Sequence, residues 1–298
     1  MRFFENGPII PAHLLEQQAQ GNVIFFCGAG VSVPAGLDTF WTLTDRLITN
    51  LDAAAARTAL SENQSFDRVF NLLVRDFGRP EIDRQIYAAL GQQKPKTLAR
   101  HRDILDLSRA PGGSVQVVTT NFDKLFERAA KGVQPIVPPG LPDIELNQPI
   151  NGVVYLHGRL ADTAAGEIAS YVISSSDFGR AYLAEGWAAR FVRALRESYT
   201  IVLLGYSADD PPMRYLLEGL HVRDGVVYDS PIYVFTDRSP SVAEELWQDR
   251  GVTPICYEAG PKHTALWSTI GAWAKGRARA GPMDRNGYCA GSKKTGNA

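Results

Sequence analysis

Residues 22–32 read Asn-Val-Ile-Phe-Phe-Cys-Gly-Ala-Gly-Val-Ser, and this stretch decides the fold that we expect for the chain. Val23 to Cys27 form an unbroken apolar run with β-branched and aromatic residues, which is typical of a strand buried on both faces of a parallel sheet. Gly28 and Gly30 remove the side chains where that strand ends, so the phosphates of a ligand can lie against backbone N–H groups. A Gly-Ala-Gly sequence also occurs in ordinary turns between a strand and a helix, so this stretch alone leaves both interpretations open.

Similar strand and helix patterns alternate along the rest of the chain, and they predict an α/β fold with a Rossmann-like, doubly wound parallel sheet. After the first strand, buried strands are expected at 115–119, 153–156, 171–174, 201–204, 232–235 and 252–257. Helical spacing of apolar residues predicts helices at 11–20, within 38–109, up to about 130, at 175–198, from about 211, at 242–248 and around 266–273. Residues 132–150 are rich in proline and are expected to be mostly irregular.

A long helical interval separates the first two strands of the expected sheet. Asp38 or Thr39 is a plausible N-cap at its start, and Phe66 to Phe77 carries apolar residues on one helix face. We interpret residues 38–110 as a helical insert or small domain beside the glycine turn, within a domain of residues 1–275, and residues 276–298 as a flexible tail. The alternative is that these segments are crossover helices covering one face of the sheet.

Composition argues against several functional classes. The 298 residues carry a formal net charge of −1, so the chain lacks the basic field that dominates nonspecific affinity for nucleic acids, and direct DNA or RNA binding is not expected. Cys27, Cys256 and Cys289 are odd in number and far apart, which predicts neither a disulfide framework nor a Cys-x-x-Cys metal site and fits a reducing cytosol. The N-terminal residues show no apolar signal core and no apolar run approaches the length of a membrane span, so we expect a cytoplasmic protein without membrane contact.

Polar residues follow several of the expected strands at the point where each strand ends. They comprise Ser32, Asn121, Asp123, His157, Ser207, Asp209 and Asp210. Because the carboxyl ends of parallel strands share one edge of a sheet, these side chains are expected to converge, and together they predict a nucleotide site. Each also has a purely structural explanation. Helix capping or the helix dipole accounts for the residues that precede helices, and a satisfied core position accounts for His157.

The order and spacing of these motifs resemble those of sirtuin-like domains. The resemblance covers about residues 11–275 and rests on Gly28-Ala29-Gly30-Val31-Ser32 with Ala35-Gly36-Leu37, on Thr119-Thr120-Asn121-Phe122-Asp123, on Leu156-His157-Gly158, and on Leu204-Gly205-Tyr206-Ser207 with Asp210. It is strongest toward the bacterial sirtuin-like branch. Members of that branch are known chiefly as NAD⁺-hydrolysing effectors of anti-phage defence, and they often act with an ATPase or an Argonaute-type protein.

The chain also departs from the deacylating members of that family. Those sirtuins usually carry a structural zinc held by two Cys-x-x-Cys pairs, and this chain has no such pair, so the resemblance is to a branch without zinc. Their Gly-Ile-Pro-Asp-Phe-Arg-type loop is replaced by Gly36-Leu37-Asp38-Thr39-Phe40-Trp41, and the segment after His157-Gly158 is short. A channel for acyl-lysine is therefore not expected.

The resemblance implies a role for each motif residue. Asn121 would hold the ribose hydroxyls or orient the attacking water, and His157 would accept a proton from a ribose hydroxyl or from that water. The pyrophosphate would lie against the glycine turn and the adenosine half beside Gly205 and Ser207, while Asp123 would contact the ribose or orient Asn121. The full set of expected cofactor-binding residues is Gly28, Ala29, Gly30, Ser32, Thr120, Asp123, Gly205, Ser207 and Asp210, with no metal ligand.

Cleavage of the N-glycosidic bond of NAD⁺ expels neutral nicotinamide from a cationic ring, so the leaving group needs no acid. We therefore expect an NAD⁺ glycohydrolase that releases nicotinamide and ADP-ribose, uses no zinc and depletes NAD⁺ when triggered. NAD⁺-dependent deacylation or ADP-ribosyl transfer to protein is one alternative, and a module that senses NAD⁺ or ADP-ribose without turnover is another. Uncontrolled NAD⁺ hydrolysis would kill the host, so the activity must be inhibited until it is triggered. We expect this control to come from a homo-oligomer, from a partner of the ATPase or Argonaute type, or from both.

Overall fold

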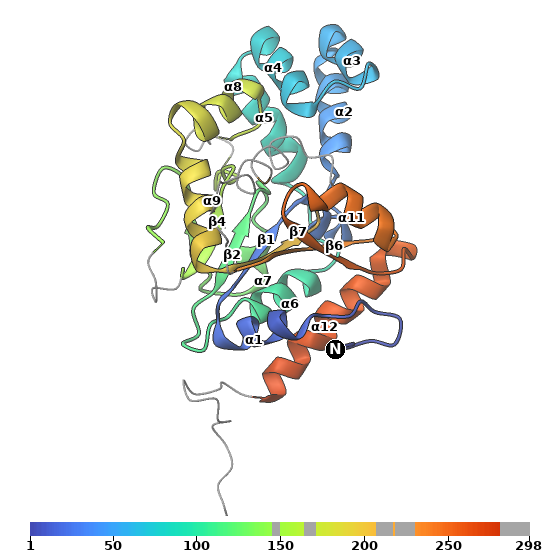
Figure 1. Cartoon of the computed structure of the whole chain (residues 1–298). Coiled ribbons are helices and arrows are strands. Elements are labelled where there is room, and N and C mark those ends of the chain that lie inside the picture. Colours follow the sequence, from blue (N-terminus) through green and yellow to red (C-terminus); the bar gives the residue numbers. More distant parts are fainter. Residues whose placement is uncertain (145–149, 164–170, 207–216, 218–229, 281–298) are drawn as a thin grey trace, which may run out of the picture.

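The computed structural model describes residues 1–144, 150–163, 171–206, 217 and 230–280, apart from the side chains of residues 278–280. Among these residues, seven parallel strands form one sheet in the order β3-β4-β2-β1-β5-β6-β7 (Figure 1). The strands are β1 (Val23–Cys27), β2 (Gln116–Thr119), β3 (Pro135–Ile136), β4 (Gly152–Tyr155), β5 (Thr200–Leu204), β6 (Ile232–Thr236) and β7 (Val252–Cys256). Because the chain builds outward from β1 in both directions, the sheet is doubly wound, and the predicted Rossmann-like α/β fold is confirmed.

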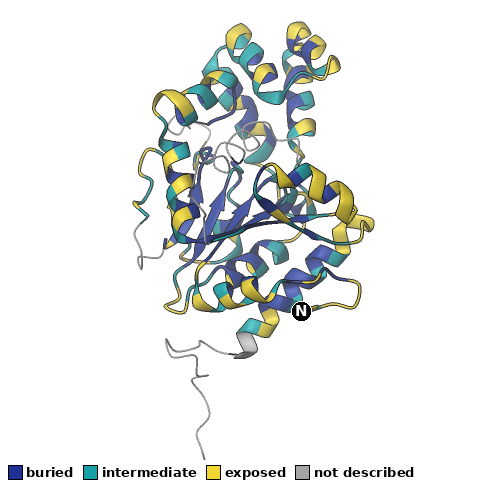
Figure 2. Cartoon of the chain, viewed as in Figure 1, coloured by how far each residue is buried: buried dark blue, intermediate teal, exposed yellow. Residues whose placement is uncertain are grey.

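Helices cover both faces of the sheet, and the buried residues gather between these layers (Figure 2). Along β1, Val23, Phe25 and Cys27 enter one apolar cluster, whereas Ile24 and Phe26 enter a second cluster on the opposite face. Both faces of β1 are therefore buried, which explains its unbroken apolar run. The first cluster is covered by α1 (Ala12–Gln20), α6 (Ala99–Leu107), α7 (Leu125–Ala129) and α12 (Thr264–Ala280), and the second by α9 (Trp187–Ser198) and α11 (Pro240–Gln248).

Four helices between β1 and β2 pack together above the carboxyl ends of the strands (Figure 1). We call them the small helical unit: α2 (Phe40–Leu51), α3 (Ala54–Ser61), α4 (Phe66–Phe77) and α5 (Arg79–Leu90). The unit begins where the sequence predicts, because the Thr39 hydroxyl accepts a hydrogen bond from the Thr42 N–H at 3.1 Å and caps α2. Side chains such as Leu47, Phe70 and Ile86 form its own apolar cluster.

Helix α6 follows the small helical unit in sequence but packs elsewhere. Its Ile104, Leu105 and Leu107 join the apolar cluster beneath the sheet, where α6 packs against α12. Residues 38–110 therefore contribute both to the small helical unit and to a crossover helix on a sheet face. The division of the chain into domains stays a prediction.

The predicted strand at 171–174 is wrong. These residues pair with no strand; the Val172 N–H donates to the carbonyl oxygen of His157 at 2.9 Å, and the Tyr171 carbonyl accepts from Arg79 at 2.7 Å. The place beside β4 is taken by β3, in the segment 132–150 that was expected to be irregular. The apolar run at 171–173 reflects side-chain burial without a strand ladder, and periodicity alone does not separate the two.

The single helix predicted at 175–198 is interrupted. It divides into α8 (Ser175–Phe178), a π-helix (Gly179–Ala184) and α9, with Gly186 in the left-handed region at φ +65°. At the other end of the chain, α12 continues to Ala280, beyond the expected start of the tail at residue 276. The helix predicted from about 211 lies outside the described residues.

Candidate functional site

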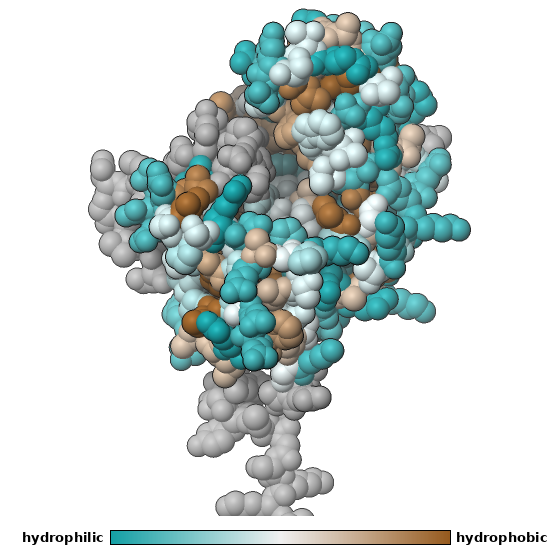
Figure 3. Space-filling view, turned by 90° about the vertical axis from the view of Figure 1, so that its right-hand side faces the viewer, coloured by the Kyte–Doolittle hydropathy of each residue, from teal (hydrophilic) through white to brown (hydrophobic). Residues whose placement is uncertain are grey.

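A cavity of about 250 Å³ lies at the carboxyl ends of the strands, next to the small helical unit. Figure 3 shows the surface hollowed between that unit and the sheet layer, with hydrophobic side chains beside the hollow. One side of the cavity, which we call the strand-end wall, comprises Ala29, Ser32, Thr120, Asn121, Phe122, Asp123, His157, Gly205 and Tyr206. The other side, which we call the helix wall, comprises Leu37, Asp38, Phe40, Leu43, Phe66, Asp67, Leu90, Val172, Ile173 and Phe178.

Most of the predicted site residues meet at this cavity. Asn121 and His157, which are far apart in the sequence, both line it. So do five of the expected cofactor-binding residues, namely Ala29, Ser32, Thr120, Asp123 and Gly205. Gly28 and Gly30 are not among the lining residues, and Ser207, Asp209 and Asp210 lie outside the described residues. The structure thus establishes a shared location for the first group, while the roles of all of them stay predictions.

The glycine turn after β1 uses its missing side chains to pack closely against the end of β5. The N–H groups of Gly28 and Gly30 donate to the carbonyl oxygens of Leu204 and Gly205 at 2.8 and 3.1 Å. A Cβ atom on Gly28 would lie 2.7 Å from the Gly205 carbonyl oxygen, and Gly205 itself has φ +73°. These two amides are therefore engaged within the protein, in contrast to the expectation that they face phosphates. The Ala29 N–H, at the cavity, has no hydrogen-bond acceptor among the described residues.

The side-chain NH₂ group of Asn121 donates hydrogen bonds within the protein. Its Nδ2 donates to the Gly28 carbonyl oxygen at 3.1 Å and to the Ser32 hydroxyl at 3.2 Å, and its backbone N–H donates to the Thr119 hydroxyl at 3.1 Å. Both amide hydrogens are used in this way, and Oδ1 has no donor among the described residues. Asn121 therefore offers its carbonyl oxygen to a ligand, as an acceptor for a sugar hydroxyl or a water molecule.

Ser32 connects Asn121 to a buried carboxylate. The Ser32 side chain is buried, and its hydroxyl donates to Asp123 Oδ2 at 2.8 Å. The other carboxylate oxygen of Asp123 accepts from the Leu125 N–H at 2.9 Å, so the helix-start explanation of Asp123 is also correct. Burial raises the pKa of the Asp123 carboxyl, and the hydrogen bonds from Leu125 and Ser32 act in the opposite direction. The Ser32 hydroxyl thus links the Asp123 carboxylate to the carboxamide of Asn121.

His101 of α6 lies behind this network, and no sequence motif predicts it there. Its Nε2 is 3.4 Å from the Ser32 hydroxyl, and its ring packs edge-on against Phe126 with centroids 4.8 Å apart. The side chain is 1% exposed, and burial lowers its pKa to about 4. The ring is therefore neutral at physiological pH. A histidine in mid-helix carries no motif, so only the packing of α6 against the sheet reveals it.

His157 follows β4 and lines the cavity with a nearly buried ring. Its carbonyl oxygen accepts from the Val172 N–H at 2.9 Å, and its Nε2 lies 2.7 Å from the Tyr182 hydroxyl. Phe178 packs edge-on against the ring with centroids 5.2 Å apart. Burial lowers the pKa of His157 to about 3, so the imidazole is neutral and one of its nitrogens is available as a proton acceptor.

Several other side chains of the site were not predicted. The Tyr206 hydroxyl lies 2.7 Å from that of Thr120 and donates to the Cys27 carbonyl oxygen at 3.3 Å, which closes the strand-end wall. Tyr206 stands inside a quoted motif, so its position next to two predicted residues was a usable signal. Leu37, Asp38 and Phe40 of the helix wall also stand in a quoted stretch, whereas Tyr182, Phe66 and Phe178 had no such signal, because the pattern of their segments indicates only helix packing.

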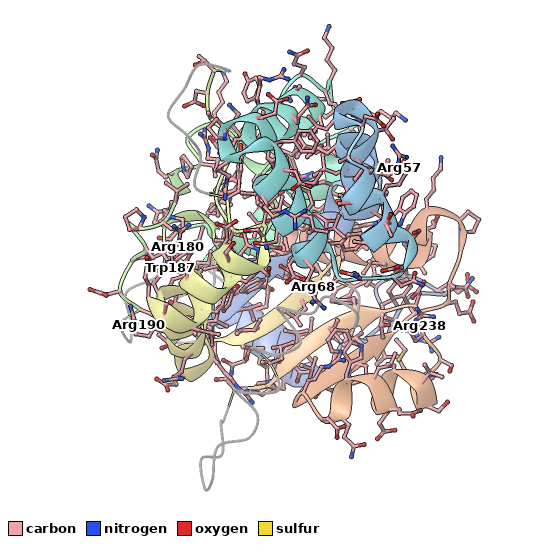
Figure 4. The ribbon with its side chains drawn as sticks, turned by 90° about the horizontal axis from the view of Figure 1, so that it is seen from above. Arg57, Arg68, Arg180, Trp187, Arg190 and Arg238 are labelled. Atoms are coloured by element: carbon pink, nitrogen blue, oxygen red, sulfur yellow. The ribbon has the colours of Figure 1, made fainter. Side chains whose placement is uncertain are left out.

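Figure 4 labels several exposed arginines as seen from above the small helical unit. In this view Arg180, Trp187 and Arg190 lie together on the side of α8 and α9, Arg238 lies on the opposite side near α11, and Arg68 lies between them. Arg180 pairs with a carboxylate of α8 at 3.2 Å. Arg68 is exposed, has no ion-pair partner among the described residues, and follows a residue of the helix wall. It therefore places a positive charge beside the cavity.

Neither a metal centre nor a membrane segment is visible in the described part of the chain. Within those residues, no group of three or more histidine, cysteine, aspartate or glutamate side chains is arranged to hold a metal ion. Likewise, no helix formed by them is long and apolar enough to cross a bilayer. Cys27 is buried, and burial raises the pKa of its thiol, so it is not a reactive thiolate.

A family model matches the central part of the chain. Residues 115–255, which include Asn121 and His157, match the family model of the SIR2-like domain. The resemblance to sirtuin-like proteins that the motif series indicates is thereby confirmed.

Two relatives extend this result along the chain. The chain is 34% identical over 293 residues to the uncharacterized protein y4cA of Sinorhizobium fredii, and the alignment covers 91% of this chain and 24% of that protein. It is 23% identical over 246 residues to defense-associated sirtuin 2 of Bacillus subtilis, covering 81% of this chain and 24% of that protein. The chain thus spans about a quarter of the length of the curated relatives it matches. A solved structure of a Sir2 homolog–NAD complex aligns at 15% identity with a TM-score of 0.41, over 92% of this chain and 97% of that one.

Proposed function

We propose that this SIR2-like domain is an NAD⁺ glycohydrolase, which cleaves NAD⁺ to nicotinamide and ADP-ribose. The observation that carries the proposal is that a carboxamide oxygen and a neutral imidazole, on Asn121 and His157, line one cavity at the strand ends of a doubly wound sheet. Sheets of this kind bind nucleotides at that edge. The SIR2-like family match supports NAD⁺ as the substrate.

Hydrolysis of NAD⁺ requires few catalytic groups from the protein besides Asn121 and His157. Nicotinamide leaves NAD⁺ as a neutral molecule, so the site must stabilise a positively charged sugar and admit water. Asn121 Oδ1 would accept a hydrogen bond from a ribose hydroxyl or from that water, and His157 would take the proton that the nucleophile gives up. The apolar helix wall would exclude bulk water from the nicotinamide ring.

The size of the cavity sets the part of the substrate that the described residues would hold. Its volume of about 250 Å³ lies just below the range of roughly 300–1,000 Å³ typical of small-molecule sites. We therefore place the nicotinamide ribose in this cavity. The residues to which the family resemblance assigns the adenosine half include Ser207 and Asp210, which lie outside the described residues.

The biological role that we propose is depletion of NAD⁺ in defence against phage. One relative is named a defense-associated sirtuin, and the alignment with each curated relative covers only 24% of that relative. We propose that further protein, supplied by a second copy or by a partner of the ATPase or Argonaute type, restrains the activity until a trigger arrives.

The test is release of nicotinamide from NAD⁺, followed by chromatography with no peptide present, for the chain alone and with its native partners. Hydrolysis proceeds under these conditions, whereas deacylation requires an acylated peptide. Asn121→Ala and His157→Ala should each lower the rate by about 10²-fold or more while the protein stays folded. His13→Ala, which removes an exposed histidine outside the cavity, should leave the rate unchanged. Full activity in both cavity variants would reject these roles, and bound but intact NAD⁺ in the complete complex would indicate a sensor.

A further inference from the structure

The partner of the His157 ring comes from a segment that was expected to be plain helix. Tyr182 lies in the π-helix Gly179–Ala184, between α8 and α9. A π-turn takes up one residue more than an α-turn, so it changes the direction of the side chains that follow, and such turns are frequent at functional sites. Here it accompanies a hydrogen bond of 2.7 Å between the Tyr182 hydroxyl and His157 Nε2.

The same segment also fixes the plane of the imidazole. The rings of Phe178 and Tyr182 both meet the His157 ring at 82°, with centroid distances of 5.2 and 5.9 Å. His157 therefore contacts two rings that are four residues apart on one stretch of chain and that lie 5.9 Å from each other, and one of its nitrogens is hydrogen-bonded to the second of them. These contacts restrict rotation of the imidazole.

The segment is in turn anchored on the small helical unit. Asp177 closes a capping box with Ser174 at the start of α8, and both of its carboxylate oxygens accept from Arg79 Nη1 of α5, at 3.0 and 2.9 Å. Asp177 and Arg79 are both largely buried, so this pair is protected from solvent screening. The orientation of His157 thus depends on helices that are inserted between β1 and β2.

The hydrogen bond to Tyr182 constrains which nitrogen can act as a base. A neutral imidazole carries a single N–H, and a tyrosine hydroxyl either donates or accepts. If Nε2 carries the hydrogen and donates to Tyr182, Nδ1 is left as a proton acceptor. Nδ1 has no hydrogen-bond partner among the described residues, so it remains for the substrate.

We infer that Tyr182 is a positioning residue for His157: its hydroxyl accepts from Nε2–H and so keeps Nδ1 unprotonated and directed to the nicotinamide ribose. This inference rests on the proposed function, in which His157 accepts a proton. Tyr182 itself touches neither the sugar nor the reacting water. When His157 takes up a proton during the reaction, the Tyr182 hydroxyl can still accept the hydrogen bond from Nε2–H. It therefore also stabilises the positively charged imidazolium.

The experiment replaces Tyr182 by Phe, which removes the hydroxyl and keeps the ring. We expect kcat for nicotinamide release to fall by about 10- to 100-fold, less than the loss caused by removing the base itself, with little change in KM or in the melting temperature. The double variant His157→Ala/Tyr182→Phe should be no slower than His157→Ala, because Tyr182 acts through the histidine. Tyr257→Phe is the matched control, since it removes a tyrosine hydroxyl that lies 3.0 Å from another histidine nitrogen, on His263, outside the cavity.

A second readout needs no activity. In protein labelled with ¹⁵N at histidine, the long-range ¹H–¹⁵N spectrum should show His157 as the Nε2–H tautomer, and Tyr182→Phe should shift it toward a mixture of tautomers. A wild-type protein without NAD⁺ cleavage would reject the proposed function, and this spectrum would still decide the role of Tyr182. The inference is overturned if His157 is the Nδ1–H tautomer, if Tyr182→Phe leaves its tautomer unchanged, or if an active enzyme keeps its full kcat without the hydroxyl.

Discussion

Asn121 and His157 both lie on the strand-end wall, but they are held in different ways. Asn121 is fixed by Gly28 and Ser32, which lie within a few residues of strand ends that neighbour one another in the sheet. The ring of His157 is oriented by Tyr182, whose segment is tied to the small helical unit through Arg79. Asn121 is therefore set by residues that follow the strand ends, whereas His157 also depends on how the helices of the small helical unit dock. Changes in the small helical unit should affect the imidazole and spare the carboxamide.

The strongest test of this contrast is Arg79→Met. Arg79 contacts Asp177 at 2.9 Å and Asp83 at 2.7 Å, and its removal leaves two nearly buried carboxylates together. We expect the free energy of unfolding, measured in urea at pH 7.5, to fall by about 3–5 kcal/mol. Arg84→Met on the same helix is the control, because Arg84 pairs with Glu81 at an exposed position, where such pairs contribute about 0–1 kcal/mol.

The deficit of Arg79→Met should shrink in acid. Burial already raises the pKa of Asp83 above its ordinary value, although Arg79 opposes this rise, so loss of Arg79 raises the pKa further. A carboxyl whose pKa is higher in the folded state than in the unfolded state stabilises the protein when protonated and loses that contribution as pH rises through the folded pKa. Lowering the pH from 7.5 to 5.5 should therefore recover part of the loss. A deficit that does not change with pH, or one no larger than that of Arg84→Met, would show that the Arg79 cluster does not anchor α8.

A smaller effect is expected from Ser32→Ala on the strand-end wall. The substitution leaves Asp123 Oδ2 without its hydroxyl donor and Asn121 Nδ2 without one of its two acceptors. Unfolding should become easier by about 1–3 kcal/mol, and nicotinamide release should slow while the His157 tautomer is unchanged. Ser61→Ala removes an exposed hydroxyl that bonds only the preceding helical turn, and it should alter none of these quantities. A changed His157 spectrum in Ser32→Ala would contradict the separate support of Asn121 and His157.

The pH dependence of stability tests His101, which belongs to the strand-end side. Its pKa is lowered from 6.5 to about 4, so below pH 6.5 the unfolded chain binds a proton that the folded chain does not, and stability falls as the pH falls. Between its pKa in the folded protein and its pKa in the unfolded chain, such a histidine changes the free energy of unfolding by about 1.4 kcal/mol per pH unit. His101→Gln should therefore reduce the slope between pH 6 and pH 5 by about this amount. An unchanged slope in His101→Gln would mean that His101 is protonated in the folded protein.

The smallest effect is expected at the rim of the helix wall. Arg68 is an exposed cation beside the cavity, and NAD⁺ carries a pyrophosphate, so Arg68→Ala should raise KM by roughly twofold to threefold at low salt and leave kcat unchanged. The difference should vanish in about 0.5 M salt, because exposed charges are then screened over a few ångströms. Arg57→Ala on α3 serves as the comparison for a general loss of positive charge. Equal effects of the two substitutions would argue against a specific position for Arg68.

Much of the fold was readable because its signals are local. The apolar run of β1, the N-cap at Thr39 and the apolar face of α4 each follow from neighbouring residues, and all appear where the sequence predicts them. The wrong strand predictions occur where apolar side chains are buried without backbone pairing, or where a strand pairs although its sequence is not apolar. Residues 171–174 are as apolar as a strand but bond to a histidine carbonyl and an arginine, and the short edge strand β3 contains a proline that obscures it.

The sequence by itself determined most of the strands and helices, the glycine turn and the position of Asn121 and His157 after strands, because these depend on periodicity and on short motifs. Only the tertiary structure decided which side chains contact and orient Asn121 and His157. His101, Tyr182 and Arg79 reach the site from helices whose patterns indicate only packing, and no local rule states which distant hydroxyl a histidine will meet. Such contacts depend on how whole helices dock onto the sheet, and this docking is set by the sum of many apolar contacts instead of by any single motif.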